Sequence, residues 1–322
     1  MIIMKTHESQ VAQALKSIAR NQHIKSYIQQ SNELYPLLLK AAKRFVTGEN
    51  KQEGIEIANE LISKGYFISL EYIGENTEDL KDCIKAKDEF LNLIKEMGSM
   101  SMNQTVSLDL SHIGLSVNPD TAYIHLQEIA EKANQYGITL MISMEESSKT
   151  DDILDIYKKA TEQYPNVGIT LQAHLYRSSD DIKELIHYPG RIRIVKGAYQ
   201  ESAEIAMART KELNNRYLKY VEQLVEANHP VSIATHDEIL IQEMEQRQLL
   251  NHPTVEIEML YGIRPDLIKD LKSKEHNCKV YLTYGQEWYL YLCHRIAEYP
   301  ENLFRAVTDM IDPSLTGERS SY

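Results

Sequence analysis

The sequence has few cysteines and no long apolar run, and each absence excludes a class of protein. Cys83, Cys278 and Cys293 are its only cysteines and lie far apart without CxxC spacing, which argues against a disulfide framework and a thiolate zinc site. The apolar start Met-Ile-Ile-Met is too short for a signal peptide, and no later stretch is as long as a membrane span. We therefore expect a cytoplasmic protein without stable membrane insertion.

Positive charge and glycine motifs are also scarce. The 322 residues include 47 acidic and 35 basic side chains, which gives a formal net charge of -12. Because phosphate backbones bind surfaces with surplus lysine and arginine, this balance argues against a nucleic-acid partner. The chain contains no GxGxxG sequence, which would indicate an open sheet that binds a dinucleotide.

Short β-type segments alternate with helical segments along most of the chain. Each β-type segment is rich in Ile, Val, Leu and Tyr, and a polar helical stretch follows it. The eight segments cover residues 66–73, 105–110, 138–143, 167–172, 191–195, 231–235, 255–260 and 279–284. The sequence therefore predicts an α/β fold, a (βα)8 barrel of the TIM type.

Helical patterns lie between these strands and at both ends of the chain. One covers 121–136 and follows the start signal Asn118-Pro119-Asp120. Another is expected over 286–298, close to the C-terminus. Residues 1–62 precede the first strand and show helical patterns, so we predict an N-terminal helical cap there and the barrel over 63–322.

Polar residues gather where the predicted strands end. Barrel enzymes carry their catalytic groups at the C-terminal ends of the strands, so these residues are candidates for function. The alternative for any one of them is a solvated loop start. The candidates are Asp109, Ser111, His112, Ser143, Glu145, Gln172, His174, Arg193, Lys196, Gly197, Thr235, His236, Asp237, Glu258, Tyr281 and Tyr284.

Arg193 is the candidate with the clearest physical argument. Side chains alternate along a strand, so Arg193 shares a face with Val195, and a charge inside an apolar strand needs a partner. The next residues, Lys196, Gly197 and Ala198, combine a positive charge with a glycine that lets backbone amides approach an anion. This turn suits a phosphate or pyrophosphate group.

The sequence contains several short motifs in a fixed order: Val195-Lys-Gly-Ala-Tyr199, Ala234-Thr-His236, Met259-Leu-Tyr-Gly262, Val280-Tyr281 through Gly285, and His294-Arg-Ile-Ala-Glu298. Taken together, these motifs resemble the proline dehydrogenase family of FAD-dependent enzymes. The similarity runs from about residue 40 to 310 and implies a distorted (βα)8 barrel with its last helix over the barrel mouth.

The resemblance implies that FAD lies across the strand ends. It places Arg193 beside the flavin N5 region and Gln172 on the pyrimidine edge. The other cofactor contacts that it implies are Met144, Val195, Lys196, Gly197, Ala198, Thr235, His236 and Glu258, with Lys196 to Ala198 near the pyrophosphate.

The resemblance also implies a proline site under the last helix. His294 and Arg295 take the places of two arginines that hold the proline carboxylate, and Glu298 orients Arg295. The remaining substrate contacts implied are Tyr281, Leu260, Asp109 and Ser143. The implied reaction is hydride transfer from ring C5 to flavin N5, which gives a pyrroline, with Arg193, Tyr281, Arg295 and Ser143 as catalytic candidates. A quinone or another carrier would accept the electrons.

Four positions depart from the family's usual residues and make the site more negative. Asp109 replaces a lysine, Ser143 an aspartate, His294 an arginine and Glu258 a glutamine. Losing one arginine weakens a bidentate grip on a carboxylate. Three interpretations stay open: a compensated loss of an ion-paired lysine and aspartate, a changed substrate such as a cyclic amine with a modified or missing carboxylate, or a weakened activity on a retained flavin scaffold.

Without the resemblance, a divalent-metal site is the alternative. Barrel hydrolases and isomerases bind metals at their strand ends, although no HxH or similarly close spacing supports such a site here. A yellow protein would favour the flavin, and a colourless protein with stoichiometric metal would favour this alternative. The ligands would come from Asp109, His112, Glu145, His236 and Glu258.

Overall fold

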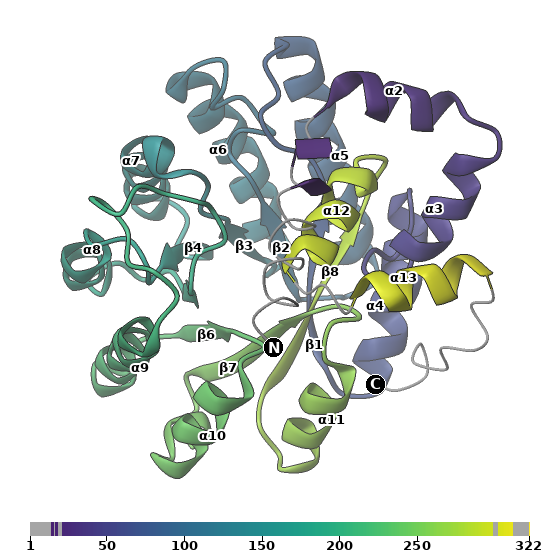
Figure 1. Ribbon diagram of the computed structural model, residues 1–322. Helices are drawn as coiled ribbons and strands as arrows, with labels where there is room; N and C mark the ends of the chain where they lie inside the picture. Colours follow the sequence, from purple (N-terminus) through teal and green to yellow (C-terminus); the bar gives the residue numbers. More distant parts are fainter. Residues whose placement is uncertain (1–13, 16, 19–20, 299–301, 312–321) are drawn as a thin grey trace.

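The computed structural model describes residues 14, 15, 17, 18, 21–298, 302–311 and 322. At its centre is a closed barrel of eight parallel strands in chain order, in which β8 pairs with β1 (Figure 1). Closure pairs both edges of every strand. The predicted barrel is thus confirmed, and its strands are β1 (Phe67–Tyr72), β2 (Thr105–Leu108), β3 (Thr139–Ile142), β4 (Val167–Gln172), β5 (Ile192–Val195), β6 (Val231–Ala234), β7 (Val255–Leu260) and β8 (Cys278–Tyr284).

Amphipathic helices cover the outside of the barrel. The predicted helix over 121–136 is α6 (Pro119–Gln135), whose N-cap Asn118 accepts a hydrogen bond from the Thr121 amide at 2.8 Å, as its start signal indicates. The others on this layer are α4 (Lys51–Ser63), α5 (Leu80–Ser99), α7 (Thr150–Thr161), α8 (Ser178–Leu185), α9 (Lys211–Glu226), α10 (Glu238–Gln246) and α11 (Pro265–Ser273), with short 3-10 turns η1 (Ser147–Lys149) and η2 (Leu249–Asn251). None of the described helices has the length and apolarity needed to cross a bilayer.

A second apolar cluster joins the two ends of the described chain. It packs α2 (Gln22–Gln30) and α3 (Leu34–Ala42) against α12 (Trp288–Glu298) and α13 (Asn302–Ile311). Phe45 and Trp288 are completely buried in it. Arg44 and Asp309 add a buried ion pair, with Nε and Oδ2 2.6 Å apart. The N-terminal helices therefore support α12, the predicted last helix.

The helix α4 packs differently from α2 and α3. Its Ile55, Ala58 and Leu61 belong to the same apolar core as the barrel strands and outer helices. The predicted division into a cap over 1–62 and a barrel over 63–322 stays a prediction.

The inside of the barrel is polar, and its lower layer holds a buried charge pair. Lys279 on β8 donates to Glu256 on β7 at 2.5 Å and to Thr105 on β2 at 2.9 Å. Ser232 on β6 donates to the same Glu256 carboxylate. Buried charges need such partners, and these contacts lie near the N-terminal ends of the strands.

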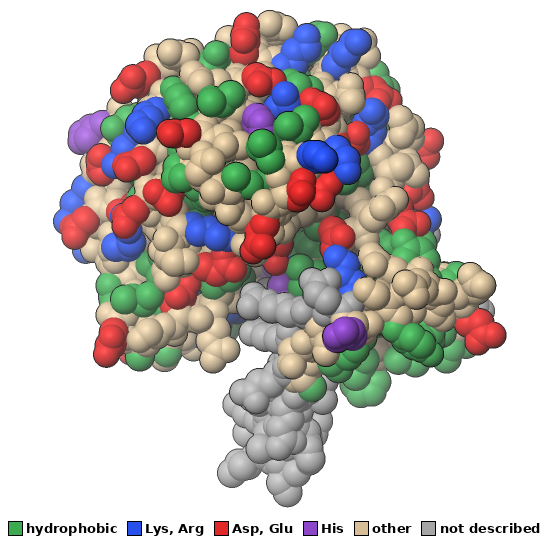
Figure 2. Space-filling model, turned by 90° about the horizontal axis from the view of Figure 1, so that it is seen from above, with side chains coloured by type: hydrophobic (Ala, Val, Ile, Leu, Met, Phe, Trp, Pro, Cys, Tyr) green, Lys and Arg blue, Asp and Glu red, His purple; other side chains and the backbone are tan. Residues whose placement is uncertain are grey.

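The outer surface carries both signs of charge. On the face seen in Figure 2, acidic and basic side chains are interspersed. Surface ion pairs include Lys158 with Glu184 at 2.7 Å and Arg247 with Glu243 at 2.6 Å. Solvent screens such pairs, so each contributes little to stability, and the buried pairs matter more.

Candidate active site

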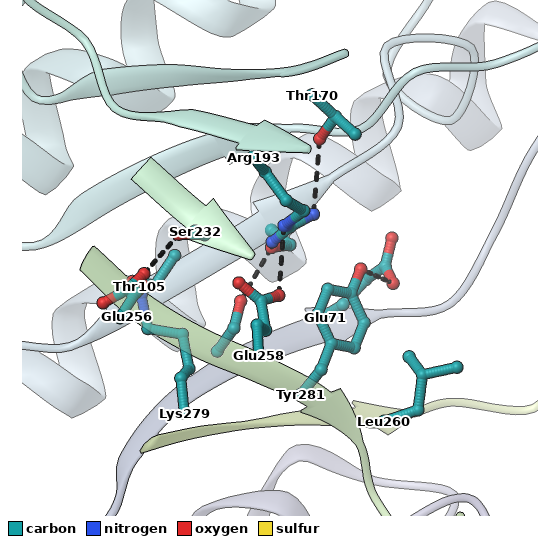
Figure 3. Close-up of polar contacts among 12 residues, drawn as sticks. Glu71, Thr105, Thr170, Arg193, Ser232, Glu256, Glu258, Leu260, Lys279 and Tyr281 are labelled. Carbon is teal, nitrogen blue, oxygen red and sulfur yellow. Dashed lines mark hydrogen bonds and ion pairs between the residues drawn. The ribbon is translucent and has the colours of Figure 1, made fainter. Parts of the chain in front are cut away.

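The Arg193 side chain extends across the inside of the barrel, one layer of side chains closer to the C-terminal strand ends than Lys279. Its Nη2 donates to Ser107 Oγ on β2 at 2.6 Å, although β2 and β5 are not neighbouring strands. Its Nε lies 3.0 Å from Glu258 Oε1 on β7 (Figure 3). Burial alone would lower the pKa of Arg193, but the Glu258, Tyr281 and Glu71 groups together outweigh it and raise that pKa. The sequence argument that this buried charge needs a partner is thus confirmed.

Tyr281 links Arg193 to a carboxylate that the sequence analysis missed. The guanidinium carbon lies 4.9 Å from the centre of the Tyr281 ring, a cation–π distance. The Tyr281 hydroxyl donates to Glu71 Oε2 on β1 at 2.5 Å. Burial, with the nearby Glu75 and Glu145 charges, raises the pKa of Glu71 from 4.5 to about 7, against the opposing effects of Tyr281 and Arg193.

Glu71 should make stability fall as pH rises from about 4.5 to 7. Its pKa is higher in the folded chain than in the unfolded chain. Its contribution to the free energy of unfolding is therefore complete below pH 4.5 and is lost as the pH rises through about 7. The variant Glu71→Gln keeps an acceptor for Tyr281 but cannot ionise, so its urea midpoint should vary less across this window. The control is Glu78→Gln. Glu78 is an exposed carboxylate that lies four residues after Gly74. Equal pH slopes in wild type and Glu71→Gln would contradict the assignment.

Asp109 and Ser143 meet at the mouth of the barrel. Ser143 hydrogen-bonds the Asp109 carboxylate, yet burial and the charges of Glu71, Glu145 and Glu75 raise the pKa of Asp109 well above its ordinary value. Asp109 follows β2, which ends at Leu108 rather than at the predicted residue 110. The mouth therefore combines several carboxylates.

Gln172 is the last residue of β4, and its side-chain oxygen is a hydrogen-bond acceptor that is not used. Its Nε2 donates to the Glu145 carbonyl oxygen at 2.7 Å, which orients the amide. Its buried Oε1 has no hydrogen-bond partner among the described residues. Buried polar atoms are normally paired, so this oxygen fits an N–H donor of a bound group.

Gly197 lets the turn after β5 pass close to His174. The φ angle of Gly197 is +110°, and a Cβ atom there would lie 1.6 Å from His174 Nδ1. That nitrogen already contacts the Lys196 carbonyl oxygen at 3.0 Å. Only glycine fits this turn, which supports the sequence argument for a close backbone approach.

The variant Gly197→Ala should lose about 2–4 kcal/mol of stability, because the His174 ring must move and the backbone is strained. Gly137→Ala is the matched control: its φ is also positive, at +64°, but the nearest atom to the added Cβ, Asn103 Nδ2, is 3.6 Å away. That control should lose only about 1 kcal/mol. Urea unfolding measures both values, and equal losses would contradict the steric argument.

Lys196 and the residues after β6 form one polar group. Lys196 Nζ donates to Asp237 Oδ2 at 2.5 Å. The other Asp237 oxygen caps α10 by accepting from the Ile239 and Leu240 amides. Thr235 Oγ1 accepts from the Asp237 amide at 3.1 Å. The predicted positive charge at Lys196 is thus already paired with an acidic side chain.

His236 follows β6 and contacts the end of β7. Its Nε2 accepts from the Leu260 amide at 2.9 Å. Burial, with the charges of Arg295 and Arg264, lowers the pKa of His236 to about 3. The ring is neutral at pH 7 and carries its proton on Nδ1. The electrostatic effect of Arg295 shows that α12 brings this arginine near the mouth.

The remaining predicted residues lie around the same mouth. Met144 is 7 % exposed, Val195 is partly exposed at the end of β5, and Ala198 is exposed in the following turn. His294 and Arg295 are partly exposed on α12, where the Arg295 guanidinium lies 4.9 Å from the Tyr291 ring centre. The side chain of Glu298 lies outside the described part of the structure.

The sequence of this chain also matches a known family. The family model described as "Proline dehydrogenase" matches residues 55–303, which is most of the chain. The chain belongs to the proline dehydrogenase family.

Curated relatives support this membership. The chain is 32% identical over 278 residues to "Proline dehydrogenase" of Deinococcus radiodurans, covering 84% of this chain and 90% of that protein. It is 31% identical over 265 residues to "Proline dehydrogenase 1" of Bacillus subtilis (strain 168), covering 81% and 87%. A solved structure of proline utilization A from Bdellovibrio bacteriovorus has the same fold, with a TM-score of 0.74 at 16% identity. That match covers 92% of this chain but only 41% of the other.

The proline dehydrogenase family is a flavoenzyme family, and the strand ends fit a flavin. The unused Gln172 oxygen matches the N–H group on the pyrimidine edge of a flavin. The Gly197 turn allows a close approach by a large ligand. A charged guanidinium, that of Arg193, lies in the barrel below.

The alternative metal site does not assemble. Glu145 accepts from the Ser111 amide and from Lys149, Glu258 pairs with Arg193, and His236 Nε2 accepts from Leu260. His112 packs against the Tyr72 ring, with the ring centres 5.1 Å apart. Across the described residues, no group of three or more His, Cys, Asp or Glu side chains is arranged to hold a metal ion.

Proposed function

We propose that this protein is an FAD-dependent proline dehydrogenase. When bound, FAD would accept a hydride at N5 from C5 of L-proline or a close cyclic amine, which gives a pyrroline. The observation that carries this proposal is the match to the proline dehydrogenase family over residues 55–303. What the protein contributes is position and electrostatics.

The residues proposed to hold FAD lie on or just after five consecutive strands, β3 to β7. Gln172 would accept from the pyrimidine edge, and Arg193 would lie beside the N5 region. Lys196 remains in this set although Asp237 pairs with it, because a phosphate group can share that cation. The complete set is Met144, Gln172, Arg193, Val195, Lys196, Gly197, Ala198, Thr235, His236 and Glu258.

The proposed substrate residues come from the strand ends and from α12. Arg295 would bind the carboxylate, with His294 as its weaker neighbour and Glu298 orienting it. Tyr281 and Leu260 would pack on the ring and exclude water from it. Asp109 and Ser143 would complete the pocket beside the ring nitrogen, and Arg193, Tyr281, Arg295 and Ser143 are the proposed catalytic residues.

A spectroscopic titration tests this function. We expect purified protein to be yellow and its flavin bands to bleach when L-proline is added without oxygen. Pyrrolidine, which has the ring but no carboxylate, is the informative second compound because of the carboxylates around Asp109. Bleaching by pyrrolidine alone would indicate a changed substrate. If no cyclic amine bleaches the flavin, the proposed activity is wrong.

The electron acceptor and the location of the protein stay predictions. A quinone is one acceptor that would fit a flavin dehydrogenase, and a cytoplasmic location follows only from the sequence argument about Cys83, Cys278 and Cys293. These three residues are buried free thiols.

A further inference from the structure

The charge of Arg193 is paired with the carboxylate of Glu258 on β7. The side chains of Arg193 and Glu258 are 5% and 2% exposed, and their Nε and Oε1 atoms are 3.0 Å apart. Ser107 and the Tyr281 ring fix the other parts of the guanidinium. The pair is therefore a rigid, nearly water-free ion pair inside the barrel (Figure 3).

A paired charge acts on its surroundings differently from a single charge. A guanidinium near a flavin favours the reduced flavin, which carries more negative charge, and also favours anions added to the ring. A carboxylate beside the same guanidinium cancels part of this field. The effect is large in a buried site, because little water screens the charges.

We infer that Glu258 is a positioning and counter-charge residue that weakens the field of Arg193 at the flavin and thereby lowers the flavin's reduction potential. This inference rests on the proposed function, since it needs a flavin over Arg193. A lower potential would make the reduced flavin of this enzyme a stronger reductant.

The variant Glu258→Gln tests this inference because it keeps the size and removes one charge. We expect the midpoint potential of the bound flavin, measured by dye-coupled reduction, to become more positive. Sulfite adds to flavins as an anion, so its dissociation constant should fall on the order of tenfold. Both measurements use the intact flavoprotein and need no turnover.

Glu256→Gln is the matched control. Glu256 lies two residues earlier on β7 and is also buried, but it pairs with Lys279 at 2.5 Å in the lower layer. Its substitution should change the sulfite dissociation constant by less than about twofold, because it is farther from the mouth. If Glu258→Gln shifts neither measurement more than Glu256→Gln does, the inference is overturned.

A second variant covers failure of Glu258→Gln to fold. Glu258→Asp keeps the negative charge but moves it away from Arg193. The midpoint potential and the sulfite affinity should therefore change in the same direction as in Glu258→Gln, but by a smaller amount. No shift, or a shift in the opposite direction, would overturn the inference. A colourless wild-type protein would instead overturn the proposed function, whereas a yellow protein with an unresponsive Glu258 would overturn only this inference.

Discussion

Replacing Arg193 with alanine should destabilise the fold by about 3–5 kcal/mol, because the Glu258 carboxylate would stay buried without its partner. Ser107 and the Tyr281 ring would lose their contacts with the guanidinium as well. The flavin absorption bands should also change in shape or intensity, because a charge near the ring disappears. Urea unfolding and a visible spectrum of the purified protein measure the two effects.

Two comparisons separate charge from packing in this prediction. The double variant Arg193→Ala with Glu258→Gln should regain part of the lost stability, since it removes the isolated charge. Arg191→Ala is the matched control, at the residue just before the same strand: its side chain is 25% exposed and its Nε lies 3.6 Å from Glu256. A loss at Arg191 as large as that at Arg193, together with an unchanged flavin spectrum for Arg193→Ala, would contradict the role of Arg193.

Replacing His294 with arginine should lower KM for L-proline about tenfold, because a charge-assisted bond to the carboxylate replaces a weaker imidazole contact. The steady-state rate at varied proline concentration measures this effect. The expected change lies in KM rather than kcat, since the new arginine binds a group that does not react.

Pyrrolidine and a neutral variant are the controls for His294. His294→Arg should not lower KM for pyrrolidine, which has no carboxylate. His294→Gln should not lower KM for either compound. A flat or higher KM for proline in His294→Arg would show that His294 does not face the substrate carboxylate.

The barrel could be predicted because its strands repeat one pattern. Each β-type run appears as a strand within a few residues of its expected limits, and helix 121–136 starts at its Asn118 cap. Short apolar runs separated by amphipathic helices leave few other folds for a chain of this length. Where the limits of an element differ from the prediction, they differ by one or two residues, as at β2, which ends at Leu108 rather than at residue 110.

The contacts inside the barrel could not be predicted in the same way. The sequence indicated that Arg193 needs a partner, but not that Glu258, two strands away, provides it. Glu71 lies within its predicted strand, as Arg193 and Glu258 do in theirs, and it was missed. Its alternation with Ser69 on the same face was the available signal, but the choice between an inward and an outward face depends on closure of the barrel.

The helix α12 is not part of the closed barrel, because all eight strands end by Tyr284. The helix that carries His294 and Arg295 packs instead on residues from the opposite end of the chain, including Phe45. A chain shortened at its N-terminus is therefore expected to keep a closed barrel and to bind the cofactor, but to bind its substrate weakly.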